Sequence, residues 1–183
     1  MHSRIALLAS IGAIALGSIG FGLAAAAEPP SPLGFGRPAT PAEIAAADID
    51  VRADGAGLPP GRGSVTDGAA LFASSCSACH GEQGQKPVAG SPRLMGGLGT
   101  LATPKPVKTV GSYWPYATTL FDYIRRAMPF QAPGSLSDDQ VYALTAYVLR
   151  LNGIVPDAAV LDAATLPKVR MPNRDGFVRN PNG

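Results

Sequence analysis

Apolar and small residues recur at helical spacing in the first half of the chain. Gly68, Phe72 and Cys76 follow one another at intervals of four, which places them on one face of a helix. Thr66 is a suitable N-cap, so the helix is predicted to begin at Asp67. A glycine on this face would let another backbone approach closely. We therefore expect the face to pack against a second helix.

The segment after Ser137 predicts that second helix. Ser137 and Gln140 have the spacing of a capping box, and the helical pattern stops near Asn152-Gly153. Between them runs an apolar stripe of the kind that faces a protein core. The stripe consists of Val141, Leu144, Val148 and Leu151.

The N-terminal 27 residues contain a long apolar run. Arg4 precedes the run, which begins at Ile5 and ends in Ala25-Ala26-Ala27. This layout is typical of a secretory signal peptide with cleavage after Ala27. An uncleaved membrane anchor is the alternative, since the run could just span a bilayer. The glycines in the run and its alanine ending favour cleavage, so we predict a signal peptide over residues 1–27 and an exported protein without stable membrane insertion.

Composition limits the folded part of the mature chain. Residues 28–61 and 154–183 are rich in proline and glycine and have few apolar runs, so we predict two extended arms around one domain at residues 62–153. Plain disorder of the arms is the alternative. The formal net charge is +2, and without a clustered basic face nucleic acid is not expected as a partner.

The two cysteines of the chain, Cys76 and Cys79, are followed at once by His80. A disulfide across two residues would be strained, and a redox-active pair would need a βαβ context rather than helical flanks. Zinc would find three ligands at most, because His2 leaves with the signal peptide. The pattern C-x-x-C-H instead predicts one covalently attached haem c. The two thiols would bond to the porphyrin, and His80 would be the proximal iron ligand.

The sixth iron ligand decides between an electron carrier and an open site for gas binding or oxidation chemistry. Without a second mature histidine, the candidates are Met95, Met128 and Met171, each of which could also simply pack in the protein. Met128 directly follows a short helix predicted from Thr119 to Ala127, and Pro129 ends that helix. We therefore predict Met128 as the ligand, with Met95 as the alternative.

Several segments outside this motif resemble one protein family. The chain from about Gly36 to Val178 is similar to the mono-haem cytochrome c subunit of bacterial sulfite dehydrogenases, and equally to that of the sulfane dehydrogenase of the Sox system. The resemblance is carried by "GRPATPAEIAAADIDVRADGAGLPPGRGSVTDGAALF", "KTVGSYWPYATTLFDYIRRAMPF", "LTAYVLRLNGIVPDAAVLD" and "LPKVRMPNRDGFV".

The resemblance implies an all-α fold, a small class I cytochrome c domain. It also implies a periplasmic protein that is no enzyme by itself. Electrons would come from a partner subunit with a molybdenum cofactor, which oxidises sulfite or sulfane sulfur, and would pass to a downstream cytochrome or oxidase. The arms would then wrap the catalytic subunit. A free-standing electron shuttle, or a haem sensor or peroxidase with an open iron, is the alternative.

The resemblance also supports Cys76 and Cys79 as attachment points, His80 as proximal ligand and Met128, in "RRAMP", as distal ligand. It places Pro92 where a backbone carbonyl could orient the His80 ring. The chain departs from the family in "SPRLMGGLGTL", where Met95 stands at a position expected to be small.

Aromatic and basic residues near these ligands have two interpretations each. Trp114 could lie in the core or beside the haem, where its indole could donate to a propionate, and we expect it beside the haem. Arg125 and Arg126 are either solvated helix charges or cations that steer an acidic partner.

Overall fold

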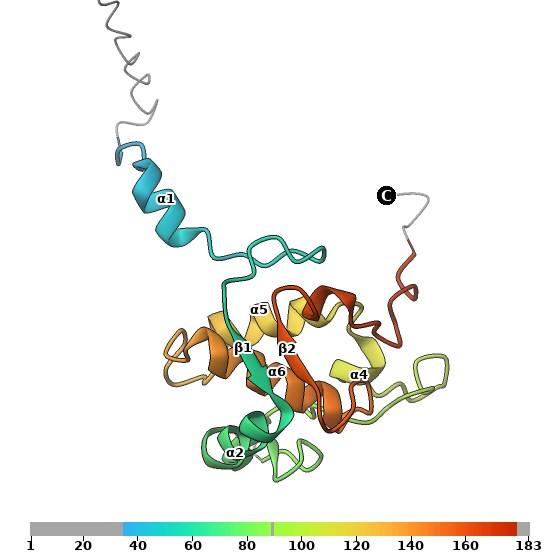
Figure 1. Ribbon diagram of the computed structural model, residues 1–183. Helices are drawn as coiled ribbons and strands as arrows, with labels where there is room; N and C mark the ends of the chain where they lie inside the picture. The colour runs from blue at the N-terminus through green and yellow to red at the C-terminus, as the bar shows by residue number, and fades with distance from the viewer. Residues whose placement is uncertain (1–34, 89, 179–183) are drawn as a thin grey trace, which may run out of the picture. The chain divides into compact units, whose positions relative to one another are not determined.

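The computed structural model describes residues 35–88 and 90–178 (Figure 1). The predicted signal peptide, residues 1–27, lies outside this part. The chain divides into two units, of which the first ends at Ile44 and the second begins at Ala45. Within the described ranges, none of the helices has both the length and the apolar character needed to cross a membrane.

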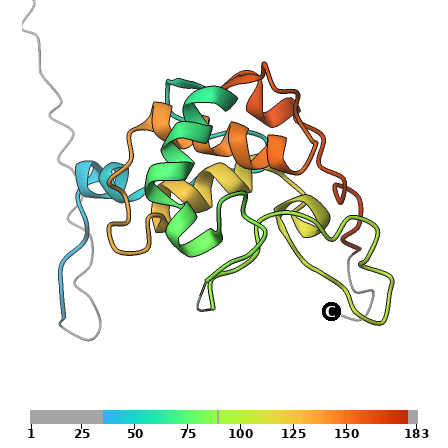
Figure 2. The same ribbon diagram turned by 90° about the horizontal axis from the view of Figure 1, so that it is seen from below.

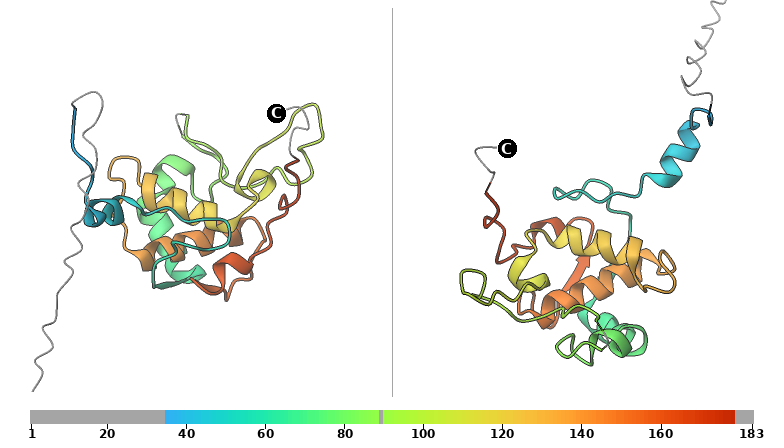
Figure 3. Two further views of the ribbon diagram at one scale, coloured as in Figure 1. Left: turned by 90° about the horizontal axis from the view of Figure 1, so that it is seen from above. Right: turned by 180° about the vertical axis from the view of Figure 1, so that it is seen from behind.

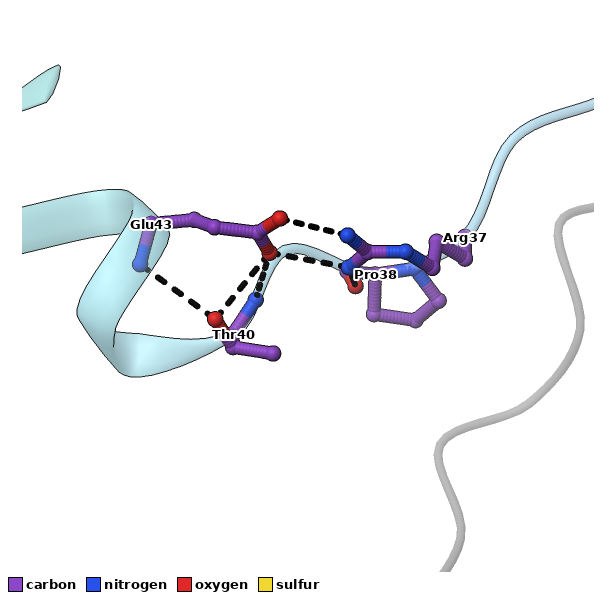
Figure 4. Close-up of polar contacts among 4 residues, drawn as sticks. All are labelled: Arg37, Pro38, Thr40 and Glu43. Carbon is purple, nitrogen blue, oxygen red and sulfur yellow. Dashed lines mark hydrogen bonds and ion pairs between the residues drawn. The ribbon is translucent and has the colours of Figure 1, made fainter.

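The described part of the first unit is organised by the start of helix α1, Pro41–Ala47. The Thr40 N–H donates to a carboxylate oxygen of Glu43 at 2.8 Å, and the Glu43 N–H donates to the Thr40 hydroxyl at 3.3 Å (Figure 4). Arg37 forms an ion pair with the same carboxylate. The Arg37 guanidinium, followed by the Thr40 hydrogen bonds, lowers the pKa of Glu43 to about 2. These contacts are all local, and every residue of α1 is exposed.

The second unit is mostly helical, as expected. Its elements are β1 (Arg62–Ser64), α2 (Val65–Ser75), α3 (Ser77–His80), α4 (Val110–Tyr113), α5 (Ala117–Ala127), α6 (Asp138–Leu151), β2 (Val160–Asp162) and the 3-10 helix η1 (Leu166–Lys168). The strands β1 and β2 form a two-stranded antiparallel sheet in which Gly63 lies opposite Leu161. Helix α6 contacts α2, α5 and this sheet, and it forms the centre of the core (Figures 1 and 2).

The contact between α2 and α6 confirms the predicted pairing of two helices. Gly68 lies directly against the Ala143 carbonyl, where a β-carbon would overlap the backbone of α6. One turn further along, the rings of Phe72 and Tyr147 pack at 5.2 Å between centroids. The predicted start of α2 is wrong by two residues, because Ser64 caps the helix. Its hydroxyl accepts from the Asp67 N–H at 3.0 Å.

The start of α6 follows the prediction. The Ser137 N–H donates to the Gln140 side chain at 2.9 Å, and the Gln140 N–H donates to the Ser137 hydroxyl at 3.3 Å. Burial extends beyond the predicted stripe, because elements pack on several sides of the helix. Tyr142, Ala146 and Leu149 are fully buried as well.

The prediction that residues 154–183 form an extended arm outside the domain is wrong for the described part. Leu161, Leu166 and Met171 are buried and belong to the main apolar cluster. These residues stand singly among polar and proline residues, so no periodic pattern indicates their burial.

The segment before Arg62 also packs on the domain. Val51 and Leu58 lie against the apolar cluster, and the Tyr142 hydroxyl donates to the Pro59 carbonyl at 2.9 Å. The second unit thus extends on both sides of the predicted limits, residues 62–153.

Candidate functional site

Cys76 and Cys79 lie where α2 passes into the single turn of α3. Cys76 ends α2 with its N–H bonded to the Phe72 carbonyl at 2.9 Å, and the Cys76 carbonyl accepts from the His80 N–H at 3.0 Å. This one turn brings Cys79 and His80 next to Cys76. Gly81 ends the turn at φ 78°, where a β-carbon would meet the Lys86 backbone. The local backbone therefore presents two thiols and an imidazole together.

The two thiols differ in their surroundings. Cys76 is half-buried and Cys79 is exposed. Burial, and secondly the nearby Cys79, raises the pKa of the Cys76 thiol to about 11. A redox-active pair needs a cysteine with a lowered pKa, whereas the pKa of Cys76 is raised even though this residue is the N-cap of the short helix α3. The arrangement therefore favours covalent attachment over dithiol exchange.

The His80 ring is held by the backbone of a later loop. Its Nδ1 lies 3.0 Å from the Pro92 carbonyl oxygen. A carbonyl can only accept, so Nδ1 carries the proton and Nε2 has the free lone pair that a metal requires. Coordinating histidines commonly have such a second partner, which fixes the tautomer and the ring orientation.

Asn152, at the end of α6, holds the loop that follows Pro92. Its Nδ2 donates to the carbonyls of Leu94 at 3.1 Å and Val148 at 2.9 Å, and its Oδ1 accepts from the Gly96 N–H at 3.3 Å. The residue is buried, so these bonds are shielded from water. Sequence reasoning used Asn152 only as a helix stop, and its position at that stop was the only signal of a role.

Thr109 holds the same loop from its other end. Thr109 caps α4, and its hydroxyl donates to the Gly96 carbonyl at 2.6 Å. The loop beside His80 is thus anchored to both α4 and α6.

Met128 ends α5, and its N–H donates to the Ile124 carbonyl at 3.1 Å. Its side chain is half-buried against the apolar cluster. Met171 is 1% exposed in the core, which fits the packing alternative rather than ligation. Met95 is also half-buried. It stands between Leu94 and Gly96, whose backbone groups both bond to the Asn152 side chain. Two of the three candidate methionines therefore remain.

Trp114 ends α4 and packs edge-on against Tyr123 of α5, with ring centroids 5.7 Å apart. Its neighbours contact the C-terminal segment instead. The Asn173 side chain donates to the Tyr113 carbonyl at 2.7 Å, and the Arg174 guanidinium lies 4.3 Å from the Tyr116 ring centroid. Trp114 therefore packs against α5, the helix that ends at Met128.

Arg125 and Arg126 both have carboxylate partners. Arg125 lies 3.2 Å from Asp138, and Arg126 pairs with Asp122 at 2.9 Å and Asp50 at 3.1 Å. The Arg125 contact fastens α5 to α6, and the contact with Asp50 fastens α5 to the segment that precedes β1. They also largely neutralise the two cations, which leaves little charge for steering a partner.

The side chains around α3 fit a covalently bound haem. Two adjacent thiols can form thioethers, and His80 offers one oriented nitrogen to the iron. A thioether sulfur from Met128 or Met95 would complete a ligand set of the type found in electron-transfer cytochromes.

Comparisons with known proteins identify the family of the domain that carries these residues. A family model described as cytochrome c matches residues 65–152. A chain in the crystal structure of the sulfane dehydrogenase SoxCD from Paracoccus pantotrophus is 47% identical, with a TM-score of 0.75, over 82% of this chain and 73% of that chain. A chain of the thiosulfate dehydrogenase TsdBA from Marichromatium purpuratum is 25% identical over 46% of this chain and 17% of that chain, with a TM-score of 0.34.

The match to the sulfane dehydrogenase chain extends well beyond residues 65–152, and it confirms the resemblance inferred from the sequence. The chain therefore belongs to the cytochrome c family, as a relative of a chain of the sulfane dehydrogenase SoxCD, and its covalently bound cofactor is haem c.

Proposed function

We propose that this protein is the periplasmic electron-transfer subunit of a molybdenum-containing dehydrogenase that oxidises sulfite or sulfane sulfur. It receives single electrons from the catalytic subunit and passes them to a downstream cytochrome or oxidase. It performs no bond chemistry on the sulfur compound itself. The similarity to a chain of SoxCD over most of its length supports the heteromer and the sulfur chemistry.

The residues around α3 have separate tasks in this proposal. Cys76 and Cys79 attach the haem, and His80 binds the iron through Nε2. The contact that carries the proposal is the 3.0 Å approach of His80 Nδ1 to the Pro92 carbonyl. It holds the ring in one orientation and makes the imidazole a stronger donor, because the carbonyl stabilises positive charge at Nδ1.

Met128 would supply the second protein ligand to the iron in this proposal. It follows the last turn of α5, a helix fastened by the ion pairs of Arg125 and Arg126, so its backbone has little freedom. A methionine ligand raises the reduction potential and occupies the position where a substrate would bind. Trp114 would lie beside the haem in this proposal. Its contact with Tyr123 supports α5, the helix that Met128 ends. The site thus suits an electron carrier.

The first experiment is a gentle purification of the native protein from the periplasm, with analysis for molybdenum and for a larger co-eluting chain. Stoichiometric molybdenum and sulfite-dependent or sulfane-dependent haem reduction are expected. A haem protein that elutes alone and without molybdenum would contradict the subunit assignment and favour a free shuttle.

The second experiment tests the ligand with a matched pair of variants. Met128→Ala should lose the charge-transfer band of methionine-ligated ferric haem, whereas Met95→Ala should keep it. Loss of the band in Met95→Ala alone would show that the wrong methionine was assigned. A wild-type protein that lacks the band and binds cyanide readily would refute the carrier function.

A further inference from the structure

One motif near the C-terminus supplies neither an attachment point nor a proposed ligand for the haem. It is MPNRDGF, residues 171–177, which follows η1. The chain here runs beside α4 in each view of the second unit (Figures 1 and 3). Several of its side chains contact the last residue of α4 and the residues that follow. We call residues 170–177 the C-terminal clasp.

The C-terminal clasp is a compact loop with a fixed start. Met171 anchors it in the core, where this side chain is 1% exposed. Arg170 and Asp175 form an ion pair at 2.6 Å across the loop. The Gly176 N–H donates to the Asn173 carbonyl at 3.2 Å, and a β-carbon on Gly176 would overlap the Asn173 side chain. The position of the Asn173 side chain is therefore well defined.

Asn173 binds the backbone at the end of α4. Its Nδ2 donates to the Tyr113 carbonyl at 2.7 Å, and the Phe177 ring packs edge-on against the Tyr113 ring at 5.1 Å between centroids. The carbonyls of the last helical turn have no partner within the helix, so this bond satisfies one of them. The same carbonyl belongs to the planar peptide unit that leads to Trp114. The hydrogen bond from Asn173 therefore fixes the direction in which the chain enters Trp114.

Arg174 contacts the chain on the other side of Trp114. Its guanidinium lies 4.3 Å from the Tyr116 ring centroid, which is within the range of a cation–π contact. The indole between these two contacts packs edge-on against Tyr123 of α5 at 5.7 Å between centroids. The C-terminal clasp thus restrains the backbone around Trp114, while α5 supports its ring.

From these contacts we infer that the C-terminal clasp positions Trp114 against the haem, with Asn173 as the positioning residue. The inference rests on the proposed function, in which Trp114 lies beside the haem. Asn173 contacts neither His80 nor Met128 through any of its hydrogen bonds, so its effect on the haem would pass through Trp114.

The effect on the haem has a predictable sign. An indole N–H is a donor only, so beside a haem propionate it would partly neutralise that carboxylate. A carboxylate that loses such a donor stabilises the more positive ferric iron more strongly. Displacement of Trp114 should therefore lower the reduction potential of the haem.

Tryptophan fluorescence of the haem-loaded full chain measures the position of the indole. Trp114 is the only tryptophan of the chain, so the emission reports on this residue alone. Energy transfer to a haem quenches a nearby indole and weakens steeply with distance, so wild type should be strongly quenched. Asn173→Ala should be severalfold brighter, and so should Asn173→Asp, because a carboxylate cannot donate to the Tyr113 carbonyl.

Thr165→Ala is the matched control. It removes a hydroxyl that bonds to the Asp162 carboxylate at 2.8 Å, a local contact elsewhere in the C-terminal segment. Its emission should equal that of wild type. Equal brightening of Asn173→Ala and Thr165→Ala would show a general loosening of the segment and would overturn the inference.

Redox titration of the same proteins tests whether Asn173 acts through Trp114. Trp114→Phe keeps an aromatic ring but removes the N–H, so it and Asn173→Ala should each lower the reduction potential, whereas Thr165→Ala should leave it unchanged. In the double variant, Asn173→Ala should cause no further change, because the indole through which it acts is gone. Additive shifts would mean that Asn173 affects the haem by another route, which would overturn the inference.

The outcomes separate this inference from the proposed function on which it rests. A wild type with unquenched fluorescence, whose potential Trp114→Phe does not change, would refute the position of Trp114 beside the haem and the inference with it. A quenched wild type in which Asn173→Ala changes neither fluorescence nor potential would refute the task of the C-terminal clasp alone. The charge-transfer band of the same wild-type sample tests the carrier function independently.

Discussion

Replacing Asn152 with alanine removes three hydrogen bonds, two of which hold the loop beside His80. The lost contacts are those to the Leu94 and Val148 carbonyls and to the Gly96 N–H, all of which involve a buried side chain. A typical hydrogen bond contributes about 1 kcal/mol to stability, so Asn152→Ala should lower the free energy of unfolding by about 3 kcal/mol. Each backbone group that is left buried and unpaired adds to this loss.

Asn173 offers a matched control for this substitution. Its side chain makes one such hydrogen bond, to the Tyr113 carbonyl at 2.7 Å, so Asn173→Ala should cost about 1 kcal/mol. Asn152→Asp should be at least as harmful as Asn152→Ala, because a carboxylate oxygen would face the two carbonyls that now accept from Nδ2.

Guanidinium chloride unfolding, followed by far-UV circular dichroism and haem absorbance, measures these differences. The midpoint should fall most for the two Asn152 variants, with an unchanged dependence on denaturant. If Asn152→Ala costs no more than Asn173→Ala, or if Asn152→Asp is as stable as wild type, the anchoring role of Asn152 is refuted.

Two further predictions concern the packing of α6 and the titration of Tyr142 in that helix. Gly68→Val should lower the free energy of unfolding by about 2–3 kcal/mol, because its β-carbon would overlap α6, whereas Ala70→Val at an exposed position of the same helix should cost only about 0.6 kcal/mol. Equal losses in a denaturant titration would contradict this close contact. Burial, and to a lesser extent nearby carboxylates, raises the pKa of Tyr142 to about 12, above its value of about 10 in the unfolded chain. Its contribution to stability is therefore complete below pH 10 and is lost as the pH rises from 10 to 12, so Tyr142→Phe should show a shallower loss than wild type in unfolding experiments across that range. The same slope in both proteins would refute this assignment.

Much of the site follows from residues that are close in the chain. Cys76, Cys79 and His80 lie within one helical turn, so their joint presentation depends on local backbone geometry alone. The capping box of Ser137 and Gln140 is likewise local, and it is present as predicted. Short-range hydrogen bonds and periodicity are the interactions that sequence patterns report.

The contacts that hold the site in place are long-range. His80 and Pro92 are 12 residues apart, and the resemblance to a family, rather than any local pattern, indicated that contact. Asn152 lies 58 residues from Leu94, and nothing near either position predicts their hydrogen bond.

The sequence by itself thus determined the cofactor, its attachment and the two principal helices, because each depends on neighbouring residues. Only the tertiary structure decided that Met171 is buried in the core and that Arg125 and Arg126 pair with carboxylates. Burial and charge pairing depend on which distant segments meet when α2, α5 and α6 pack together. The packing of these helices depends on shape complementarity and on apolar burial summed over the whole domain. A local stretch of sequence contains too little of this information to predict the contacts.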